Sequence, residues 1–417
     1  MASDSTRAQR LIMAATVVGF ALRLAFAFGY WEHRPLTHDE REYLALARSL
    51  AQGKGFVYDA PASETGTSQQ FGRAPGYPAF LALIGAGREE FDATPARVKL
   101  AQSIVGAVGV WLIGLIGYRA AGARAGIAAA AMAAVYPPLV WICSYVLSEA
   151  LYSTMALASV VLLNLAIDRA EIRRYTAAPL AITAGLAVGF AILVRPVMLL
   201  FLPIAALWLI ARRRTPIALA VIVAAALVVA PWTLRNARVY HRFVLVASEG
   251  GVTFWTGNHP RARGEGDLAA NPHIKVADLA FRAEHPEMSA EELEPLYYRD
   301  ALRYIGGHPL WWIGLLLKKM FYTIVPAGPS YALHSPLYRV VSIASYLLVL
   351  PLGVLGAIRW RSRPHPPEAL VPLALSAVVV CILFFPQERF RIPVLDPALI
   401  VCAGAWYGLR TRETVGM

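Results

Sequence analysis

The sequence LIMAATVVGFALRLAFAFGY occupies residues 11–30 and is followed by Thr37-His38-Asp39-Glu40. The apolar run is long enough to cross the hydrocarbon core of a bilayer as a helix. It lacks a small-residue cleavage pattern at its exit, so we interpret it as a retained membrane helix and not as a signal peptide. Acids placed where a chain leaves the membrane are costly unless they face water, a cation or a reacting substrate. The paired acids Asp39 and Glu40 therefore mark a candidate site at a membrane boundary.

The composition indicates a polytopic membrane protein. Of the 417 residues, 57% are hydrophobic and only 16% are charged, whereas soluble proteins carry roughly 25% charged residues. The net charge of +12 does not by itself indicate a nucleic-acid partner, because lysine and arginine near membrane ends set topology. The cysteines Cys143, Cys381 and Cys402 lie within or beside apolar runs and form no metal-binding spacing.

Six clusters of arginine lie between or beside the apolar runs, and placing all six in the cytoplasm gives a self-consistent path. We therefore predict an all-α integral membrane protein, a bundle of about 10 transmembrane helices (range 10–12) with both termini in the cytoplasm. The clusters are Arg7/Arg10, Arg119/Arg124, Arg169/Arg173/Arg174, Arg212–Arg214, Arg359/Arg361/Arg363 and Arg410/Arg412. The predicted spans are 9–30, 98–117, 125–142, 144–167, 176–193, 196–211, 215–232, 337–358, 368–385 and 393–409.

Two long segments then face the outside of a single membrane domain, residues 1–417. The first is residues 31–97, which holds the paired acids, and the second is residues 233–336. Within the second, Pro309–Pro326 is apolar but interrupted by Lys318 and Lys319. We predict an amphipathic helix lying in the interface there, because a membrane crossing would move Arg359–Arg363 outside and break the charge pattern. The short cytoplasmic connections leave no room for a soluble catalytic domain.

The two acids differ in their structural context. Thr37-x-x-Glu40 ahead of an apolar periodic stretch has the spacing of a capping box that opens an amphipathic helix, with Gly53 as its stop. Glu40 is thus either a helix cap or a catalytic group. Asp39 is not needed for the cap, and a carboxylate at this position can accept a proton from an acceptor hydroxyl. Both remain candidate catalytic residues.

Short motifs along nearly the whole chain resemble the polytopic GT-C glycosyltransferases, most closely glycosyltransferase family 39, which includes protein O-mannosyltransferases and aminoarabinose transferases of lipid A. The resemblance implies a sugar donor carried on a polyprenyl phosphate, and an inverting transfer at the outer face with Asp39 as general base. The motifs are His38-Asp39-Glu40, Gly53-Lys54-Gly55-Phe56, Arg73-Ala74-Pro75-Gly76-Tyr77-Pro78, Ser148-Glu149, Arg195-Pro196, Pro231-Trp232-Thr233-Leu234-Arg235-Asn236, Trp255-Thr256-Gly257-Asn258 and Arg389-Phe390-Arg391-Ile392-Pro393.

A lipid-linked donor leaves behind a phosphate with developing negative charge, which arginine or lysine at the outer boundary would stabilise. The candidates for donor-phosphate binding are Arg389, Arg391, Lys318, Lys319 and Arg73. Those for acceptor contact or structural support are Glu149, Tyr77, Arg235 and Asn258. No histidine or cysteine spacing predicts a metal or cofactor; the alternative is a divalent cation bridging Asp39 and the donor phosphate.

The sequence predicts an enzyme of a bacterial-type cytoplasmic membrane whose site lies on the extracytoplasmic side. The acceptor is a lipid, a glycan or a protein, the other partners are membrane lipids, and no nucleic acid is expected. No G-x-G-x-x-G strand–helix context offers a site for a nucleotide sugar. Two alternatives stay open. One is a transporter or flippase of lipid-linked sugars, against which the position of the charges at the boundary argues. The other is a glycan polymerase or ligase, which usually works from a large late loop.

Overall fold

The computed structural model describes residues 2–57, 72–88, 92–172, 176–265, 270–329, 335–360 and 368–413. These residues form helices joined by turns, with one isolated bridge between Pro35 and Ala93. Parts of both predicted outer segments lie outside these ranges, namely residues 58–71, 89–91, 266–269 and 330–334. Arg173, Arg174, Arg361 and Arg363 of the basic clusters also lie outside them.

Several helices cross the membrane. Five are long and apolar enough to do so: Ser5–Tyr30, formed by α1 (Ala2–Ala25) and η1 (Phe26–Tyr30), then α4 (Ala96–Ala121), α7 (Glu149–Ile172), α10 (Thr215–Tyr240) and α15 (Pro336–Trp360). Five shorter apolar segments accompany them: α5 (Ala123–Val135), α8 (Ala178–Val194), Pro196–Ala211 formed by η4 (Pro196–Leu200) and α9 (Phe201–Ala211), α16 (Leu370–Leu383) and Leu395–Leu409 of α18 (Leu395–Glu413). Each predicted span overlaps one of these ten helical segments. That the five shorter segments also cross the membrane stays a prediction.

Among the helix boundaries that differ from the prediction are those of α5, α7 and α10. The span expected at 125–142 is broken after Val135, because Pro137 has no amide hydrogen to continue α5 and instead opens the short α6 (Pro137–Trp141). The span expected at 144–167 begins only at Glu149, after a non-helical turn. In contrast, α10 is longer than the predicted span 215–232, and it ends at Tyr240 because His241 adopts a left-handed conformation.

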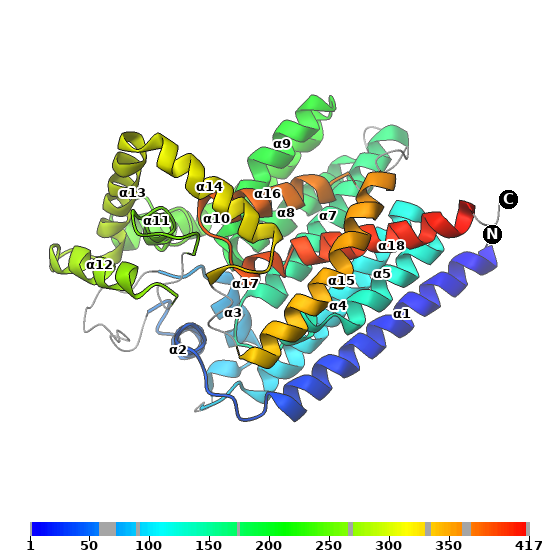
Figure 1. Cartoon of the computed structure of the whole chain (residues 1–417), viewed down its shortest axis with the longest axis horizontal. Helices are drawn as coiled ribbons and strands as arrows, with labels where there is room; N and C mark the ends of the chain where they lie inside the picture. Colours follow the sequence, from blue (N-terminus) through cyan, green and yellow to red (C-terminus); the bar gives the residue numbers. More distant parts are fainter. Residues whose placement is uncertain are drawn as a thin grey trace.

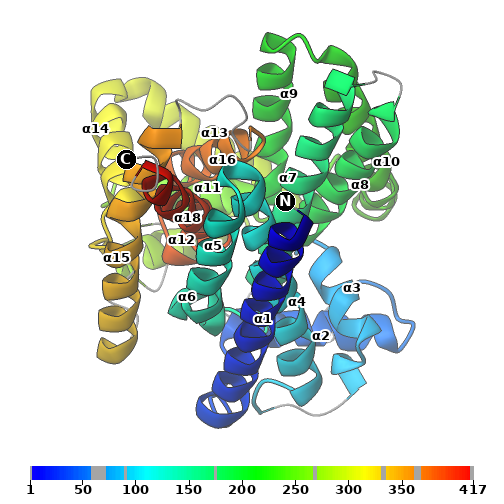
Figure 2. The same ribbon diagram turned by 90° about the vertical axis from the view of Figure 1, so that its right-hand side faces the viewer.

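Small residues set how closely the central helices approach one another. A Cβ added at Gly356 of α15 would lie 1.8 Å from the carbonyl oxygen of Cys402 in α18. A Cβ added at Gly404 of α18 would lie 2.6 Å from the carbonyl oxygen of Ala125 in α5. Close backbone approach at small residues is typical of membrane helix packing. Figure 2 shows α15 and α18 on one side of the bundle and α8, α9 and α10 on the other.

The polar part of the molecule gathers at one end, which we call the site end. Figure 1 shows both chain termini at one end of the bundle, and α2 (His38–Ala51), α3 (Gly76–Leu83), α11 (Gly250–Gly257), α12 (Pro272–Ala283) and α13 (Ala290–Gly307) toward the other. We call α11, α12 and α13 the cap. It has a small apolar core of its own, formed by Val252, Trp255, Ile274, Leu293, Tyr297 and Ala301.

Two further short elements complete the site end. The helix η2 (Ala86–Arg88) packs against α2, and α17 (Glu388–Arg391) fills the turn between α16 and α18. The apolar helix α14 (Pro309–Ile324) follows the cap and runs across the direction of α1 and α15 in Figure 1. Its exposed apolar side chains are Leu310, Ile313, Leu317, Met320, Phe321 and Ile324.

Candidate active site

The predicted capping box opens α2. The backbone N–H of Thr37 donates to Glu40 Oε2 at 2.8 Å, and the reciprocal bond of the box is also present. The other oxygen of Glu40 accepts a bond of 2.8 Å from the backbone N–H of Val146, in the turn before α7. Burial raises the pKa of Glu40, although these backbone hydrogen bonds oppose the rise. Glu40 thus caps α2 and fastens it to the bundle.

Asp39, the next residue back, lies between two arginines that come from distant parts of the chain. Its Oδ1 accepts from Arg73 Nη2 at 2.7 Å, and its Oδ2 accepts from Arg389 Nη1 at 2.9 Å. Burial would raise the pKa of Asp39, but the charges and hydrogen bonds of Arg73 and Arg389 together hold this pKa well below its ordinary value. Asp39 is therefore a carboxylate whose two oxygens are both engaged.

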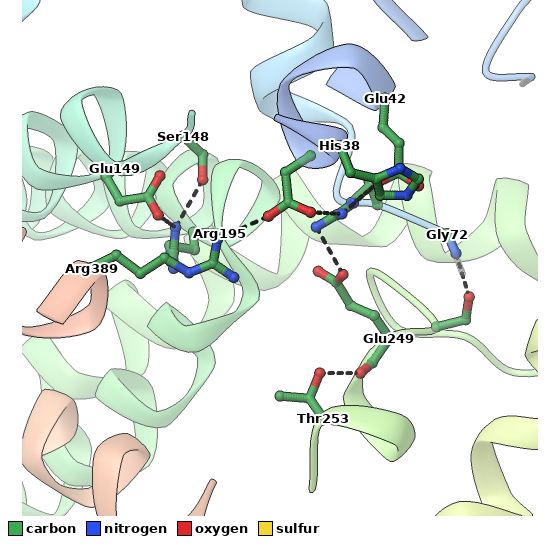
Figure 3. Close-up of polar contacts among 12 residues, drawn as sticks. His38, Glu42, Gly72, Ser148, Glu149, Arg195, Glu249, Thr253 and Arg389 are labelled. Carbon is green, nitrogen blue, oxygen red and sulfur yellow. Dashed lines mark hydrogen bonds and ion pairs between the residues drawn. The ribbon is translucent and has the colours of Figure 1, made fainter. Parts of the chain in front are cut away.

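Arg73 is held by three carboxylates. Besides Asp39, its Nε donates to Glu42 Oε2 at 2.9 Å, and its Nη1 lies 3.1 Å from Glu249 Oε2. Burial would lower the pKa of Arg73, but the surrounding carboxylates raise it well above its ordinary value. The guanidinium also lies over the Tyr43 ring, 5.3 Å from its centroid. Arg73 and Arg389 thus form one network with the carboxylates of Asp39, Glu42 and Glu249. Figure 3 labels Glu42, Glu249 and Arg389 of this network.

Arg389 is more exposed than Arg73. Its Nε donates to Gln387 Oε1 at 2.8 Å, and 38% of its side chain is exposed. In contrast, Arg391 is only 4% exposed, lies 2.9 Å from Asp396, and places its guanidinium 3.8 Å from the centroid of the Tyr346 ring. Of the two predicted arginines in α17, one faces Asp39 and the other is buried among protein groups.

A second ion pair lies beside the first. Glu149, the first residue of α7, places Oε1 2.8 Å from Arg195 Nη1, and both side chains are largely buried. Arg195 also donates to Ser148 Oγ at 3.1 Å. Its guanidinium lies 5.0 Å from the centroid of the Phe390 ring, which Arg389 approaches to 5.7 Å. The structure therefore pairs Glu149 with an arginine, next to the Asp39 network (Figure 3).

Lys319 and Asn258 meet in a buried cluster between the cap, α14 and α16. Lys319 Nζ donates to Asn258 Oδ1 at 3.0 Å, and Asn258 Nδ2 donates to the carbonyl oxygen of Leu383 at 2.9 Å. Trp312 adds a third bond, from Nε1 to Asn258 Oδ1 at 2.9 Å. Burial lowers the pKa of Lys319 to about 7. Its neighbour Lys318 is exposed on α14.

Tyr77 and Arg235 support the site end. The Tyr77 hydroxyl donates to Gln102 Oε1 at 3.2 Å, and its ring meets Tyr43 edge to face. Arg235, in the last part of α10, donates to the carbonyl oxygen of Phe56 at 3.3 Å and stacks its guanidinium over Trp232. These contacts tie α3 and α10 to the segment that carries α2.

The side chains around Asp39 suit guanidinium groups better than a divalent cation. Both Asp39 oxygens accept from arginines, and Glu40 is turned toward backbone amides. Within the described ranges no group of three His, Cys, Asp or Glu side chains is placed to hold a metal ion. A cation bound to Asp39 would have to displace Arg73 or Arg389. We therefore derive no step through a metal.

Two residues of the network were missed in the sequence. Glu42 follows Asp39 by three positions, so helical spacing places both on one face of α2 and could have indicated it. Glu249 precedes the Trp255-Thr256-Gly257-Asn258 motif in a segment with no spacing relation to Arg73. Nothing in the sequence indicated that contact.

Comparison with known proteins supports the predicted resemblance to glycosyltransferase family 39. Residues 74–234 match the family described as dolichyl-phosphate-mannose-protein mannosyltransferase. The matched segment covers less than half of the chain and is similar to glycosyltransferase family 39. The predicted resemblance is therefore confirmed, and the matched segment includes Tyr77, Glu149 and Arg195 but neither Asp39 nor Arg389. A comparison with curated protein sequences found no match.

Solved structures show the fold. The oligosaccharyltransferase of Archaeoglobus fulgidus tethered with an acceptor peptide is 13% identical with a TM-score of 0.60, over 96% of this chain and 50% of that one. The oligosaccharyltransferase AglB of the same archaeon, in complex with an inhibitory peptide and a dolichol-phosphate, gives 14% identity and a TM-score of 0.57, over 97% and 51%. Our chain thus spans about half the length of AglB, and the likeness shows a GT-C-like fold. ArnT from Cupriavidus metallidurans bound to undecaprenyl phosphate gives 16% identity and a TM-score of 0.40, over 97% and 78%.

Proposed function

We propose that the protein is a membrane glycosyltransferase that moves a sugar from a polyprenyl-phosphate carrier to a hydroxyl of a lipid, glycan or protein. The observation that carries the proposal is the contact between Asp39 and Arg389 at the site end of the bundle. It brings a proton acceptor and a phosphate-binding cation to one place. The family 39 segment and the GT-C-like fold support the same reaction class.

Arg389 is the phosphate ligand in this proposal. A guanidinium binds phosphate oxygens through charge-assisted hydrogen bonds, and partial exposure leaves Arg389 accessible to a lipid headgroup. Of the other predicted cations, Arg391 and Lys319 are buried among protein partners, and Arg73 already contacts three carboxylates. Lys318, exposed on α14, is suited to contact with lipid headgroups.

Donor binding would change the state of Asp39. The donor phosphate and the Asp39 carboxylate compete for the same guanidinium, so a phosphate at Arg389 releases Asp39 Oδ2. Loss of that ion pair, together with the approach of a second anion, raises the pKa of Asp39 toward its ordinary range. The carboxylate then becomes a better base when the sugar is in place, while Arg73 still holds its other oxygen.

The transfer then proceeds by a single displacement. The acceptor oxygen forms a bond to the anomeric carbon of the sugar, and the bond from that carbon to the phosphate oxygen breaks. Asp39 accepts the proton of the acceptor hydroxyl. The polyprenyl phosphate leaves with the bonding electrons, its charge stabilised by Arg389. Attack opposite the leaving group inverts the anomeric centre.

The site is proposed to face the extracytoplasmic side of a bacterial-type cytoplasmic membrane, with both termini in the cytoplasm. The arginine clusters near the termini and in the connections support this orientation. A donor that resides in the bilayer also suits a site at the end of a membrane bundle. In the same proposal α14 lies in the interface, with its apolar face toward the lipid.

The test is release of the carrier. Protein in lipid nanodiscs is incubated with a membrane extract of the source organism that supplies both lipid-linked sugars and acceptor hydroxyls, and free polyprenyl phosphate is quantified. We expect wild-type protein to release polyprenyl phosphate and the Asp39→Asn variant to release none above background. Movement of intact lipid-linked sugar across a vesicle membrane, without release by either protein, would contradict the proposal and indicate a flippase.

A further inference from the structure

The chain just before the cap is fastened to the loop that carries Arg73. The backbone N–H of Ser248 donates to the carbonyl oxygen of Gly72 at 3.1 Å, and the Gly72 N–H donates to Ser248 Oγ at 2.7 Å. The next residues on the two chains, Glu249 and Arg73, form an ion pair at 3.1 Å. Figure 3 shows the Gly72 bond beside the Glu249 pair. Three contacts thus join segments 176 positions apart.

Glu249 itself is well fixed. Its backbone carbonyl accepts from the Thr253 hydroxyl at 2.6 Å and from the Thr253 N–H at 3.1 Å, at the start of α11. Its side chain remains one-third exposed, whereas that of Glu42 is largely buried. The orientation of the carboxylate toward Arg73 is therefore set by α11 and by the Gly72–Ser248 pairing.

With Glu249, the carboxylates of the network outnumber its guanidinium groups. The two guanidinium groups of Arg73 and Arg389 face the carboxylates of Asp39, Glu42 and Glu249, so the network has a net charge of −1 with His38 neutral. If Glu249 were absent, the network would be neutral and Arg73 Nη1 would lack this ion pair. An anionic lipid phosphate at Arg389 would then meet less repulsion.

We propose that Glu249 is a positioning residue that aims Arg73 at Asp39 and limits the affinity of the site for the anionic lipid carrier. This inference rests on the proposed function, because it concerns the phosphate that the site would bind and release. Its consequence is that the spent carrier, which has more negative charge than the sugar-linked donor, is bound weakly enough to leave. Glu249 touches neither sugar nor phosphate in this scheme and acts through Arg73.

The experiment measures the affinity of purified protein in nanodiscs for undecaprenyl phosphate, at several KCl concentrations. We expect Glu249→Gln to bind undecaprenyl phosphate about three- to tenfold more tightly than wild type, because a nearby negative charge is removed. The gain should shrink as KCl is raised, because salt screens the interaction. Glu249→Asp, which keeps the charge, should restore wild-type affinity and salt dependence. Glu287→Gln, an exposed acid between α12 and α13, is the matched control and should bind as wild type does.

Each outcome is decisive. Unchanged or weaker binding by Glu249→Gln, or equally tight binding by Glu249→Asp, would overturn the inference. If Glu249→Gln does not yield folded protein, Glu249→Ala removes the same charge and carries the same expectation. Failure of the proposed function is distinguishable, because wild-type protein would then bind undecaprenyl phosphate no better than uncharged undecaprenol.

Discussion

Asp39 and Arg389 are 350 positions apart in the chain, yet Asp39 Oδ2 lies 2.9 Å from Arg389 Nη1. One residue stands in the first turn of α2, and the other in the short α17 between α16 and α18. The pair joins the first and last parts of the bundle at its site end. In the proposed function, the Asp39 carboxylate and an incoming phosphate compete for the Arg389 guanidinium.

Asp39→Asn tests the base. The substitution keeps the shape and removes the proton acceptor, so transfer to a hydroxyl acceptor should fall about 10²–10⁴-fold. The substitution also removes the ion pairs with Arg73 and Arg389, so the unfolding temperature should fall, and rates are compared on folded protein. The measurement is initial rate of polyprenyl phosphate release in nanodiscs, with Asp92→Asn, an exposed acid before α4, as control. Wild-type rates in a well-folded Asp39→Asn protein would remove Asp39 from the chemistry.

Arg389→Gln tests the phosphate contact. Loss of a charge-assisted hydrogen bond should weaken binding of undecaprenyl phosphate roughly tenfold or more. Arg299→Gln, an exposed arginine on α13, changes the net charge equally and should have little effect. Binding is measured by titration of purified protein at fixed ionic strength. Equal losses in the two variants would show that only overall charge matters and would contradict a specific contact.

The pH dependence of transfer should show the exchange at Arg389. In free protein the two arginines hold the pKa of Asp39 well below its ordinary value, so the acid limb of kcat/KM should lie at low pH. With donor bound, one ion pair is lost and the pKa rises, so the acid limb of kcat should lie at higher pH. Coincident limbs, measured on one protein preparation, would argue against competition for Arg389.

The same ion pairs predict how stability depends on pH. Because the folded-state pKa of Asp39 is depressed, its contribution is present above the unfolded value of about 3.9 and is lost as pH falls through the folded value. Arg389→Gln should raise the folded pKa toward the unfolded one. Its unfolding temperature should therefore differ from wild type at neutral pH and converge with it in acid. A constant difference across that range would contradict this reading.

The ion pair between Glu149 and Arg195 lies beside the site and should also stabilise the folded protein. Removing one partner of a buried ion pair leaves an uncompensated charge and costs about 3–5 kcal/mol, so Glu149→Gln should lower the unfolding temperature clearly. Glu171→Gln breaks the more exposed pair with Arg214 at the terminal end of the bundle and should cost about 0–1 kcal/mol. Equal shifts for both variants would show that Glu149 is not held as described.

Gly257→Ala should displace the cap from α16. A Cβ at this position would lie 2.1 Å from the carbonyl oxygen of Phe384, just before the turn that carries Arg389. Overpacking of this kind costs about 1–3 kcal/mol, and we expect a matching loss of thermal stability with weaker transfer. At Gly306 an added Cβ meets nothing within 4 Å, so Gly306→Ala should be neutral or slightly stabilising. Equal stability of the two variants would contradict the close contact.

Local features of the fold could be predicted from the sequence, and contacts between distant segments could not. The apolar runs predicted the membrane helices because a helix that crosses the hydrocarbon core needs about twenty mostly apolar residues. The spacing of Thr37 and Glu40 predicted the capping box. The break at Pro137 was missed because the apolar run continues across it. The roles proposed for Asp39 and Arg389 rest on the chemistry of these residues and on the family resemblance, and they stay predictions.

Charge identity in the sequence does not reveal which cations are accessible. Lys319 and Arg391 were predicted as phosphate ligands together with their neighbours Lys318 and Arg389. The structure shows that Lys319 and Arg391 are both buried. Helical geometry turns adjacent residues to different faces, and the face that is buried depends on partners such as Asn258 and Asp396 from other segments. That information resides in the tertiary packing.

The most direct measurement is a structure of the protein in nanodiscs with bound undecaprenyl phosphate. The account predicts that the lipid phosphate lies within hydrogen-bond distance of the Arg389 guanidinium, in the place where Asp39 Oδ2 accepts in the free protein. Asp39 should then retain only its contact with Arg73. A phosphate bound at Lys318 on α14, with the pair between Asp39 and Arg389 intact, would contradict the central claim.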